Sequence, residues 1–329
     1  MSRIKFLLLP VGFLLVCGIY ANNFSRLHIQ GSVQYVPFAK LVNGRADTPF
    51  QYRFLIPWLA RTSHPYLEHL HLADSIDETK DLFEFSFVFA LLGVFIYCSP
   101  YLVLNDPQSN IRRNSLVRWA AAWLLMLALP FHYILPLKTY YYPSDIPAIL
   151  FFVLGLTFLR QKKWSLYYLI FIIGTFNRET TIFLSIVYLL TSWKSTPRHK
   201  LAIYFTLQVL TWLAIKILLW WMFKNNASES VWYADAMGMF KYSWSQNLEF
   251  LSDPQTIVNL FSVYGYLWIP LIALWKDIRD QWLRPALLTI PLFHLAMLIP
   301  GEINELRIYG EMLPLVILGI LAGTITNEK

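Results

Sequence analysis

Long apolar stretches alternate with short polar ones along the whole chain, a pattern that is typical of a helical membrane protein. A helix needs roughly 20 apolar residues to cross a bilayer, and on this basis we predict about ten membrane-spanning segments, some of them short. They are expected at residues 6–21, 83–104, 117–135, 146–159, 166–176, 182–190, 201–223, 257–275, 286–300 and 312–323. The sequence therefore predicts an all-α polytopic membrane protein, with residues 1–329 in a single integral membrane domain.

The central segment, residues 164–193, has a polar interruption. Asn177, Arg178, Glu179 and Thr180 lie between two apolar runs, and a basic cluster flanks the segment on each side. Basic clusters beside membrane segments tend to remain in the cytoplasm, so we predict a short helix pair that enters the membrane, turns at the polar residues and returns. Charged residues at such depth usually face a polar cavity. The alternative is a pair of adjacent side chains, Arg178 and Glu179, that only neutralise each other.

Two longer polar stretches are predicted to be outer loops, at residues 22–82 and 224–255. Within the first, residues 50–59 are too apolar for a free loop, and we predict an amphipathic segment that lies at the membrane interface. A shorter outer turn, residues 136–145, is rich in Tyr, as interfacial segments often are.

The distribution of charge favours one orientation. The six segments predicted to be inside hold 15 of the 27 Lys and Arg residues but 4 of the 20 acidic residues. This bias follows the positive-inside rule and predicts that both termini are cytoplasmic, with the bacterial inner (plasma) membrane as the expected location. Charged residues make up 14% of the chain, against roughly 25% in soluble domains. The net charge of +7 is therefore explained by membrane topology, and no nucleic-acid partner is expected.

The unusual polar residues all fall on the predicted outer side. This arrangement suits an amphiphile with an anionic head and a tail in the bilayer. Arg binds phosphate through paired charge-assisted hydrogen bonds, and a nearby carboxylate can act as a general base. The candidate catalytic residues are Asp47, Asp145 and Glu179, and the candidate substrate-binding residues are Arg53, Tyr142, Asn177, Arg178, Glu305 and Arg307. We expect Arg53, Arg178 and Arg307 to converge on one outward-facing pocket.

Structural roles remain open for several of these residues. Asp145 stands at a predicted helix start, where it or Ser144 would cap the helix. Arg307 would form a structural pair with Glu305 or Glu311.

No spacing of His, Cys, Asp and Glu indicates a tight metal site. Asp47 together with Asp145 or Glu179 would offer carboxylates to a loosely held divalent cation. Cys17 and Cys98 lie in apolar runs and form neither a disulfide framework nor a zinc pattern.

The chain also resembles a known family. Lys163 and Trp164, followed by an apolar run and Gly174–Thr180, are similar to the helix pair of membrane-integral glycosyltransferases of the C superfamily, in which a Lys often stands in place of Arg178. The resemblance implies transfer of a sugar from a polyprenyl-phosphate-linked donor to a saccharide, lipid or protein acceptor at the outer (periplasmic or lumenal) face. Members commonly place a catalytic acid in the first outer loop, where this chain has Asp47. The acidic pair that many members carry there is missing, and the chain corresponds to a small form without their soluble C-terminal domain.

Two other classes of function remain as alternatives. A transporter or flippase of a lipid-linked saccharide would also need buried charges and broken helices, but in two halves related by a repeat. The sequence shows a single polar interruption, and its charges gather on one side. The other alternative is a non-catalytic membrane subunit of a polysaccharide assembly complex.

Overall fold

A computed structural model describes residues 3–34, 36–104, 111–136, 139–227, 247–248, 250–299 and 301–326. These residues form an all-helical structure (78% helix, without strands). The only sheet-like pairing among them is an isolated bridge between Val33 and Tyr140. The prediction of an all-α protein is therefore confirmed for the described part of the chain.

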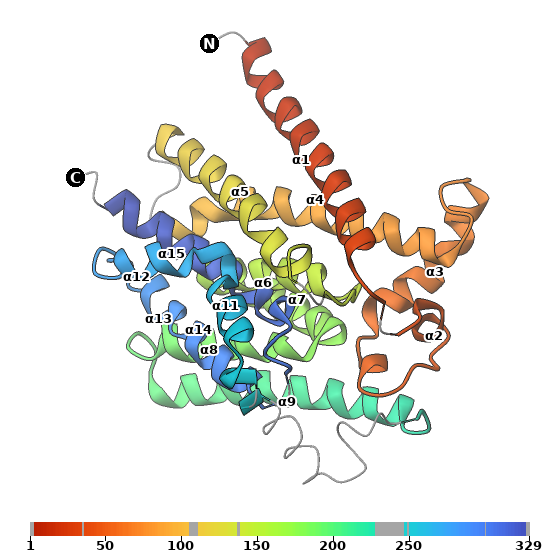
Figure 1. Cartoon of the computed structure of the whole chain (residues 1–329). Helices are drawn as coiled ribbons and strands as arrows, with labels where there is room; N and C mark the ends of the chain where they lie inside the picture. Colours follow the sequence, from red (N-terminus) through yellow and green to blue (C-terminus); the bar gives the residue numbers. More distant parts are fainter. Residues whose placement is uncertain are drawn as a thin grey trace.

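The helices follow one another through mostly short connections, and α1 projects beyond the others at its N-terminal end (Figure 1). The longer helices are α1 (Arg3–Gly31), α3 (Leu55–His69), α4 (Ile76–Val103), α5 (Ile111–Tyr133), α6 (Asp145–Arg160), α7 (Trp164–Asn177), α8 (Phe183–Ser192), α9 (Arg198–Phe223), α11 (Pro254–Phe261), α14 (Thr289–Met297) and α15 (Leu313–Thr326). The short helical segments are α2 (Phe38–Val42), η1 (Phe50–Tyr52), η2 (Glu179–Ile182), η3 (Val263–Tyr266), α12 (Trp268–Ala273), α13 (Leu283–Leu287) and η4 (Leu306–Met312).

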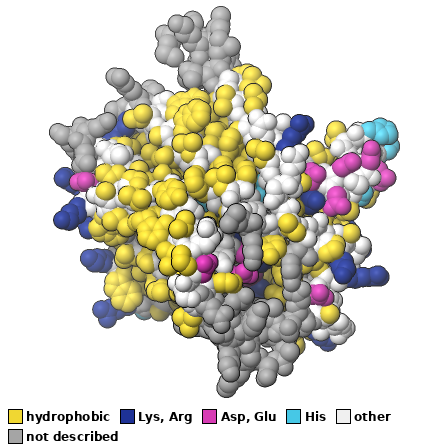
Figure 2. Space-filling model, in the orientation of Figure 1, with side chains coloured by type: hydrophobic (Ala, Val, Ile, Leu, Met, Phe, Trp, Pro, Cys, Tyr) yellow, Lys and Arg dark blue, Asp and Glu magenta, His cyan; other side chains and the backbone are white. Residues whose placement is uncertain are grey.

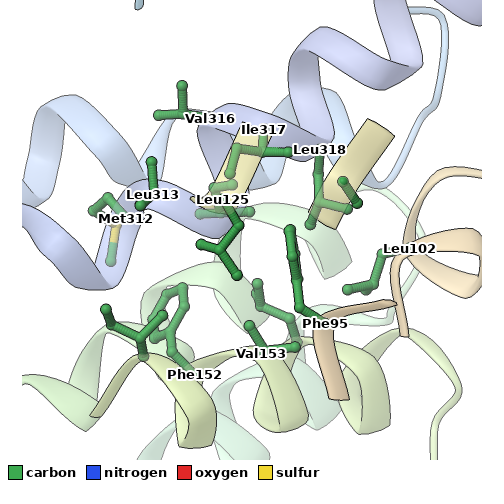
Figure 3. Packing of buried hydrophobic residues seen from close by; sticks show 14 of the residues in the cluster. Phe95, Leu102, Leu125, Phe152, Val153, Met312, Leu313, Val316, Ile317 and Leu318 are labelled. Atoms are coloured by element: carbon green, nitrogen blue, oxygen red, sulfur yellow. The ribbon is translucent and has the colours of Figure 1, made fainter. Parts of the chain in front are cut away.

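The apolar core lies where α4, α5, α6 and α15 meet (Figure 3). Phe95 of α4, Leu125 of α5, Phe152 of α6 and Leu318 of α15 are all buried. Nearly every residue of α6 is buried, as is 94% of the most apolar part of Leu306–Ile325. Helices that are apolar on all sides need such surroundings, so α6 and α15 form the centre around which the other helices pack.

Within the described residues, four helices are long and apolar enough to cross a membrane, and each overlaps a predicted segment. They are Ile76–Val103, Arg113–Tyr133, Arg198–Phe223 and Leu306–Ile325. Shorter apolar helices lie at Trp164–Asn177, Glu179–Ser192 and Leu283–Met297. These lengths and compositions indicate a helical membrane protein, whereas the count of about ten spans stays a prediction.

The predicted span at residues 257–275 is wrong as a single helix. The structure divides it into α11, η3 and α12, with left-handed backbone at Tyr264 (φ 59°) and Gly265 (φ 60°). A Cβ added at Gly265 would lie 2.9 Å from a ring carbon of Phe131, so the break lets α5 approach this backbone closely. Hydropathy does not reveal the break, because the composition stays apolar across it.

The predicted outer loop at residues 22–82 is largely helical, which corrects its description as a polar loop. Helix α1 continues through residue 31, and α4 begins at residue 76. At the start of α4, the Ser75 side chain accepts a hydrogen bond from Glu78 N at 3.2 Å, and Glu78 Oε2 accepts one from Asp74 N at 2.6 Å. Side chains that satisfy backbone groups in this way explain why a polar stretch starts a long helix.

The predicted amphipathic segment at residues 50–59 is present as η1 and the first part of α3. Ile56 and Ala60 of α3 are buried, while Trp58 is 45% exposed. The other predicted outer loop, residues 224–255, lies mostly outside the described residues.

Basic side chains lie at both edges of the face in Figure 2, whereas acidic and His side chains lie mostly at one edge. Figure 2 shows Lys and Arg along the left edge, the end where α12, α13 and the C-terminus lie in Figure 1. Acidic and His side chains gather at the opposite edge, beside α3, and hydrophobic side chains cover much of the surface between them.

The orientation is testable by cysteine labelling, because Asn43, Ser165 and Ser195 are all exposed. We expect Ser165→Cys and Ser195→Cys to be protected from a membrane-impermeant thiol reagent in intact cells, because the basic clusters beside them stay inside. Asn43→Cys is expected to react. The native Cys17 and Cys98 are buried, so the unsubstituted chain is the background control. Reaction of Ser195→Cys from outside would exclude a helix pair that returns to the inner side.

Candidate functional site

Asp145 is the residue on which the charged side chains converge. It begins α6, and its carboxylate is fully buried. Arg178 Nη1 donates to Oδ1 at 2.8 Å, and Arg307 Nη1 lies 3.4 Å from both carboxylate oxygens. A buried charge needs such partners, since an unpaired charge away from water is strongly unfavourable. Asp145 thus joins α6, the α7–η2 junction and η4.

Two further carboxylates complete this group of buried ions. Arg178 Nε lies 3.4 Å from Glu311 Oε1, and the Thr180 hydroxyl donates to the same oxygen at 2.6 Å. Arg307 donates to Glu305. We call Asp145, Arg178, Arg307, Glu305 and Glu311 the arginine–carboxylate cluster. The structural pairing of Arg307 with Glu305, which the sequence left open, is present.

The interpretation of Arg178 and Glu179 as a self-neutralising pair is wrong. Arg178 has an extended backbone (φ −158°, ψ 142°), which points successive side chains in opposite directions. Glu179 is 42% exposed and lies 3.8 Å from Lys216 Nζ of α9. Asn177 donates to Ser144 O at 2.9 Å and so fixes the end of α7 against the start of α6. Ser144 forms no side-chain cap at α6.

Tyr142 lies between two guanidinium groups. The Cζ atoms of Arg307 and Arg53 lie 4.1 Å and 4.5 Å from the centre of its ring, and Phe50 stacks on it at 5.6 Å. Such contacts stabilise a cation by roughly 2 kcal/mol when they are desolvated. Burial raises the pKa of Tyr142, so its phenol is neutral and offers the cations only its aromatic face.

Arg53 differs from the other two arginines because it has no acidic partner within hydrogen-bond distance in the described residues. Its Nη1 is buried and makes no hydrogen bond there. Burial and the nearby Arg178 lower the pKa of Arg53, but arginine stays protonated because its pKa is ordinarily above about 12. Arg53 therefore keeps the capacity to bind an anion.

The segment that carries Asp47 and Arg53 is held in place by buried amides. Gln51 accepts a hydrogen bond from Ala46 N at 2.9 Å and donates to Leu41 O at 3.0 Å. Asn226, after α9, donates to Gly44 O and Ala46 O. Asp47 itself is half-buried, and no hydrogen bond or ion pair of its carboxylate is found in the described residues.

The structure separates the predicted site residues into two sets. Those it brings together around Asp145 and Tyr142 are Arg53, Asn177, Arg178, Glu305 and Arg307. Asp47 and Glu179 form no direct contact with this set through their side chains among the described residues. The residues that the sequence did not identify as part of the site are Thr180, Glu311, Gln51, Asn226 and Lys216. The position of Glu311, an acid at the start of an apolar run, indicates a role in the site. Nothing in the sequence around Gln51 and Asn226 indicates theirs.

A divalent cation does not fit the predicted carboxylates. Asp145 is already bound by two guanidinium groups, which would repel a second cation. In the described part of the chain there is no group of three or more His, Cys, Asp or Glu side chains placed to hold a metal ion.

Comparison of the chain with protein-family models, with curated proteins and with solved structures found no match. What is established is the class, an all-helical protein with helices able to span a membrane, and the geometry of the site.

Neutralising Asp145 tests how far the cluster depends on it. In Asp145→Asn, Arg178 and Arg307 lose a buried counter-charge, and removal of one partner of a buried ion pair typically costs about 3–5 kcal/mol. We expect a clear fall in the thermal unfolding temperature of the purified protein in detergent. Asp77→Asn is the matched control, because Asp77 is 61% exposed. Equal unfolding temperatures for the two variants would contradict a central role for Asp145.

Proposed function

We propose that this protein transfers a sugar from a polyprenyl-phosphate-linked donor to an acceptor hydroxyl at the outer membrane face. The observation that carries the proposal is Arg53, a partly buried arginine whose buried Nη1 has no hydrogen-bond partner and which has no acidic partner among the described residues, held beside Tyr142 near a charged cluster. The similarity of residues 163–180 to glycosyltransferases of the C superfamily supports the same reaction class. The acceptor is a saccharide, a lipid or a protein.

The proposed topology has about ten crossings, both termini in the cytoplasm and the site on the opposite side, in a bacterial inner membrane. The bias of Lys and Arg toward the predicted inner segments supports it. Asp145 begins α6 and Arg178 follows the last residue of α7, so both lie at the helix ends opposite to the basic stretch, residues 160–163, that connects the two helices.

Charge around Arg53 favours an anionic headgroup. Arg53 and Lys216 are two cations on this side, and Lys216 Nζ lies 5.1 Å from the ring centre of Tyr52. The carboxylate that faces them is Glu179, which is 42% exposed and only loosely paired with Lys216. Arg53 binds the phosphate of such a headgroup through charge-assisted hydrogen bonds.

An apolar groove supports a lipid-linked donor. It has a volume of about 300 Å³ and is formed by α11, η3, α12 and α14, with Phe261, Trp268 and Ile290 in its lining. His294, which also lines it, stacks on Tyr309 of η4 at 4.5 Å. Because η4 also carries Arg307, one element links the groove to the arginine–carboxylate cluster. This geometry suits a ligand with an anionic head and an isoprenoid chain.

The chemistry assigns separate roles to the carboxylates. The acceptor oxygen attacks the sugar carbon that bears the phosphate, from the opposite face, and the carbon–oxygen bond to the phosphate breaks. Asp47 takes the proton of the acceptor hydroxyl, since its carboxylate is half-buried and makes no ion pair among the described residues. Arg53 stabilises the charge on the departing phosphate. Asp145 holds the arginines, and Glu179 is the second candidate for the base.

Asp47→Asn keeps the shape of the side chain but removes the base. We expect the rate of transfer to fall by roughly 10²–10⁴-fold, the usual contribution of general acid–base catalysis. Turnover of a radiolabelled pool of lipid-linked sugars by purified protein measures the effect, with the unfolding temperature as a check on folding. Glu68→Gln, which changes an exposed acid of α3, is the matched control.

Full activity in Asp47→Asn would remove this residue from the mechanism and make Glu179→Gln the next variant. If the unsubstituted protein turned over no lipid-linked sugar from a broad panel but moved a lipid across liposomes, a transporter would replace the glycosyltransferase.

Arg53→Gln tests binding of the headgroup. Loss of a hydrogen bond to a charged group costs about 1.5–3 kcal/mol, so the Kd for a polyprenyl phosphate is expected to rise about tenfold to a hundredfold. Calorimetric titration in detergent measures it, and Arg61→Gln on the exposed face of α3 is the control. An unchanged Kd in Arg53→Gln would place the phosphate elsewhere.

A further inference from the structure

A second buried polar pair joins α1 to α4. His28 Nδ1 lies 2.7 Å from Glu84 Oε1, and the two side chains are 0% and 1% exposed. This pair is buried, yet it plays no part in the reaction proposed above. Imidazole is the side chain whose charge changes most readily near neutral pH, so the charge of the pair depends on whether His28 carries a second proton.

Polar atoms without partners surround this pair. His28 Nε2 and the hydroxyls of Tyr133 and Tyr141 are buried and make no hydrogen bond in the described residues. Both tyrosine rings contact the imidazole edge-on, with ring centres 5.5 Å and 5.1 Å away. Buried polar groups rarely remain unsatisfied, and here three of them lie in adjoining side chains.

Tyr133 extends from His28 to the arginine–carboxylate cluster. Its hydroxyl lies so close to Gly310 that any side chain at position 310 would collide with it. Position 310 lies in η4 between Arg307 and Glu311, two members of the cluster. A single aromatic ring, that of Tyr133, therefore lies between the His28–Glu84 pair and the buried ions.

The groups that face His28 from each packed element are few. Helix α4 contributes Glu84 and, one turn earlier, Lys80 and Asp81; the Lys80 Nζ lies 5.3 Å from the ring centre of Tyr141. Helix α5 contributes Tyr133, and the segment before α6 contributes Tyr141. On α1 itself the charged neighbour is Arg26, which is exposed and lies on the other side of the helix.

We propose that His28, Glu84 and Tyr133 form a buried proton-binding site that is coupled through the arginine–carboxylate cluster and Tyr142 to Arg53. This site takes up a proton when an anionic headgroup binds at Arg53. The proton comes from solvent and ends on His28, and no other bond forms or breaks. The imidazolium is stabilised by Glu84, and Tyr133 lies between the imidazole, which its ring contacts, and Gly310 of η4, which its hydroxyl approaches.

The coupling is electrostatic. An added anion favours a positive charge nearby, and interactions between charges are strong where water is excluded. Because binding takes up a proton, affinity for the anion is greater at low pH and falls as pH rises, by up to about tenfold per pH unit for one fully linked proton. The inference rests on the proposed function only in taking an anionic lipid headgroup as the ligand.

Calorimetry with a dialkyl phosphodiester tests the linkage, because this probe does not itself titrate near neutral pH. Titrations in buffers of different ionisation enthalpy give the number of protons taken up on binding. We expect uptake approaching about one proton in the unsubstituted protein and none in His28→Gln. His64→Gln is the matched control, since His64 is paired with Thr79 on α3 and α4 and lies outside both groups. Tight binding without proton uptake, or equal uptake in His28→Gln, would overturn the proposal.

A measurement without ligand separates this inference from the proposed function. In protein labelled with ¹⁵N-histidine, the resonances of His28 are assigned by their loss in His28→Gln. Glu305→Gln removes one negative charge from the cluster, so His28 is expected to gain its proton at lower pH than in the unsubstituted protein. Tyr133→Phe is expected to shift the Nε2 resonance.

Two failures are distinguishable by these experiments. If the phosphodiester does not bind but Glu305→Gln moves the titration of His28, the donor site is wrong and the coupling stands. If Glu305→Gln and Tyr133→Phe both leave the His28 resonances unchanged, the coupling is wrong, whatever the protein binds.

Discussion

The structure depends on one shared carboxylate. The carboxylate of Asp145 accepts hydrogen bonds from Arg178 and Arg307, which lie 33 and 162 residues away along the chain. Each of the three charges would be strongly unfavourable alone in this apolar surrounding, so the segments that carry them are stable only together. The start of α6, the junction after α7 and η4 are thereby held together. Helices α6 and α15, which continue from the first and the last of these, form part of the apolar core (Figure 3).

The shared carboxylate also decides which cation is left for a ligand. Because Arg178 and Arg307 are neutralised internally, Arg53 is the member of the set without an acid at hydrogen-bond distance in the described residues. It lies in a segment that Gln51 and Asn226 fix by hydrogen bonds to backbone groups. An arginine on a fixed segment is a better anion site than a mobile one, since less conformational freedom is lost on binding. The same segment presents Asp47.

Much of the fold follows from the sequence. Long apolar stretches predict α4, α5, α9 and α15 because a helix satisfies its own backbone hydrogen bonds and leaves only side chains to the bilayer or the core. The polar residues around 178 predict the break after α7, and the arginines beside apolar sequence predict which cations gather around Asp145.

Only the tertiary structure decided how these parts pair. The sequence offers Glu179 as the neighbour of Arg178, but the extended backbone directs the two side chains apart and remote acids neutralise the arginine. The break at η3 and the pairing of His28 with Glu84 have no local signature either. Composition and periodicity indicate whether a helix is surrounded by water, lipid or other helices. Ion pairs, left-handed turns and hydroxyls without partners depend instead on which distant segments come within a few ångströms of each other.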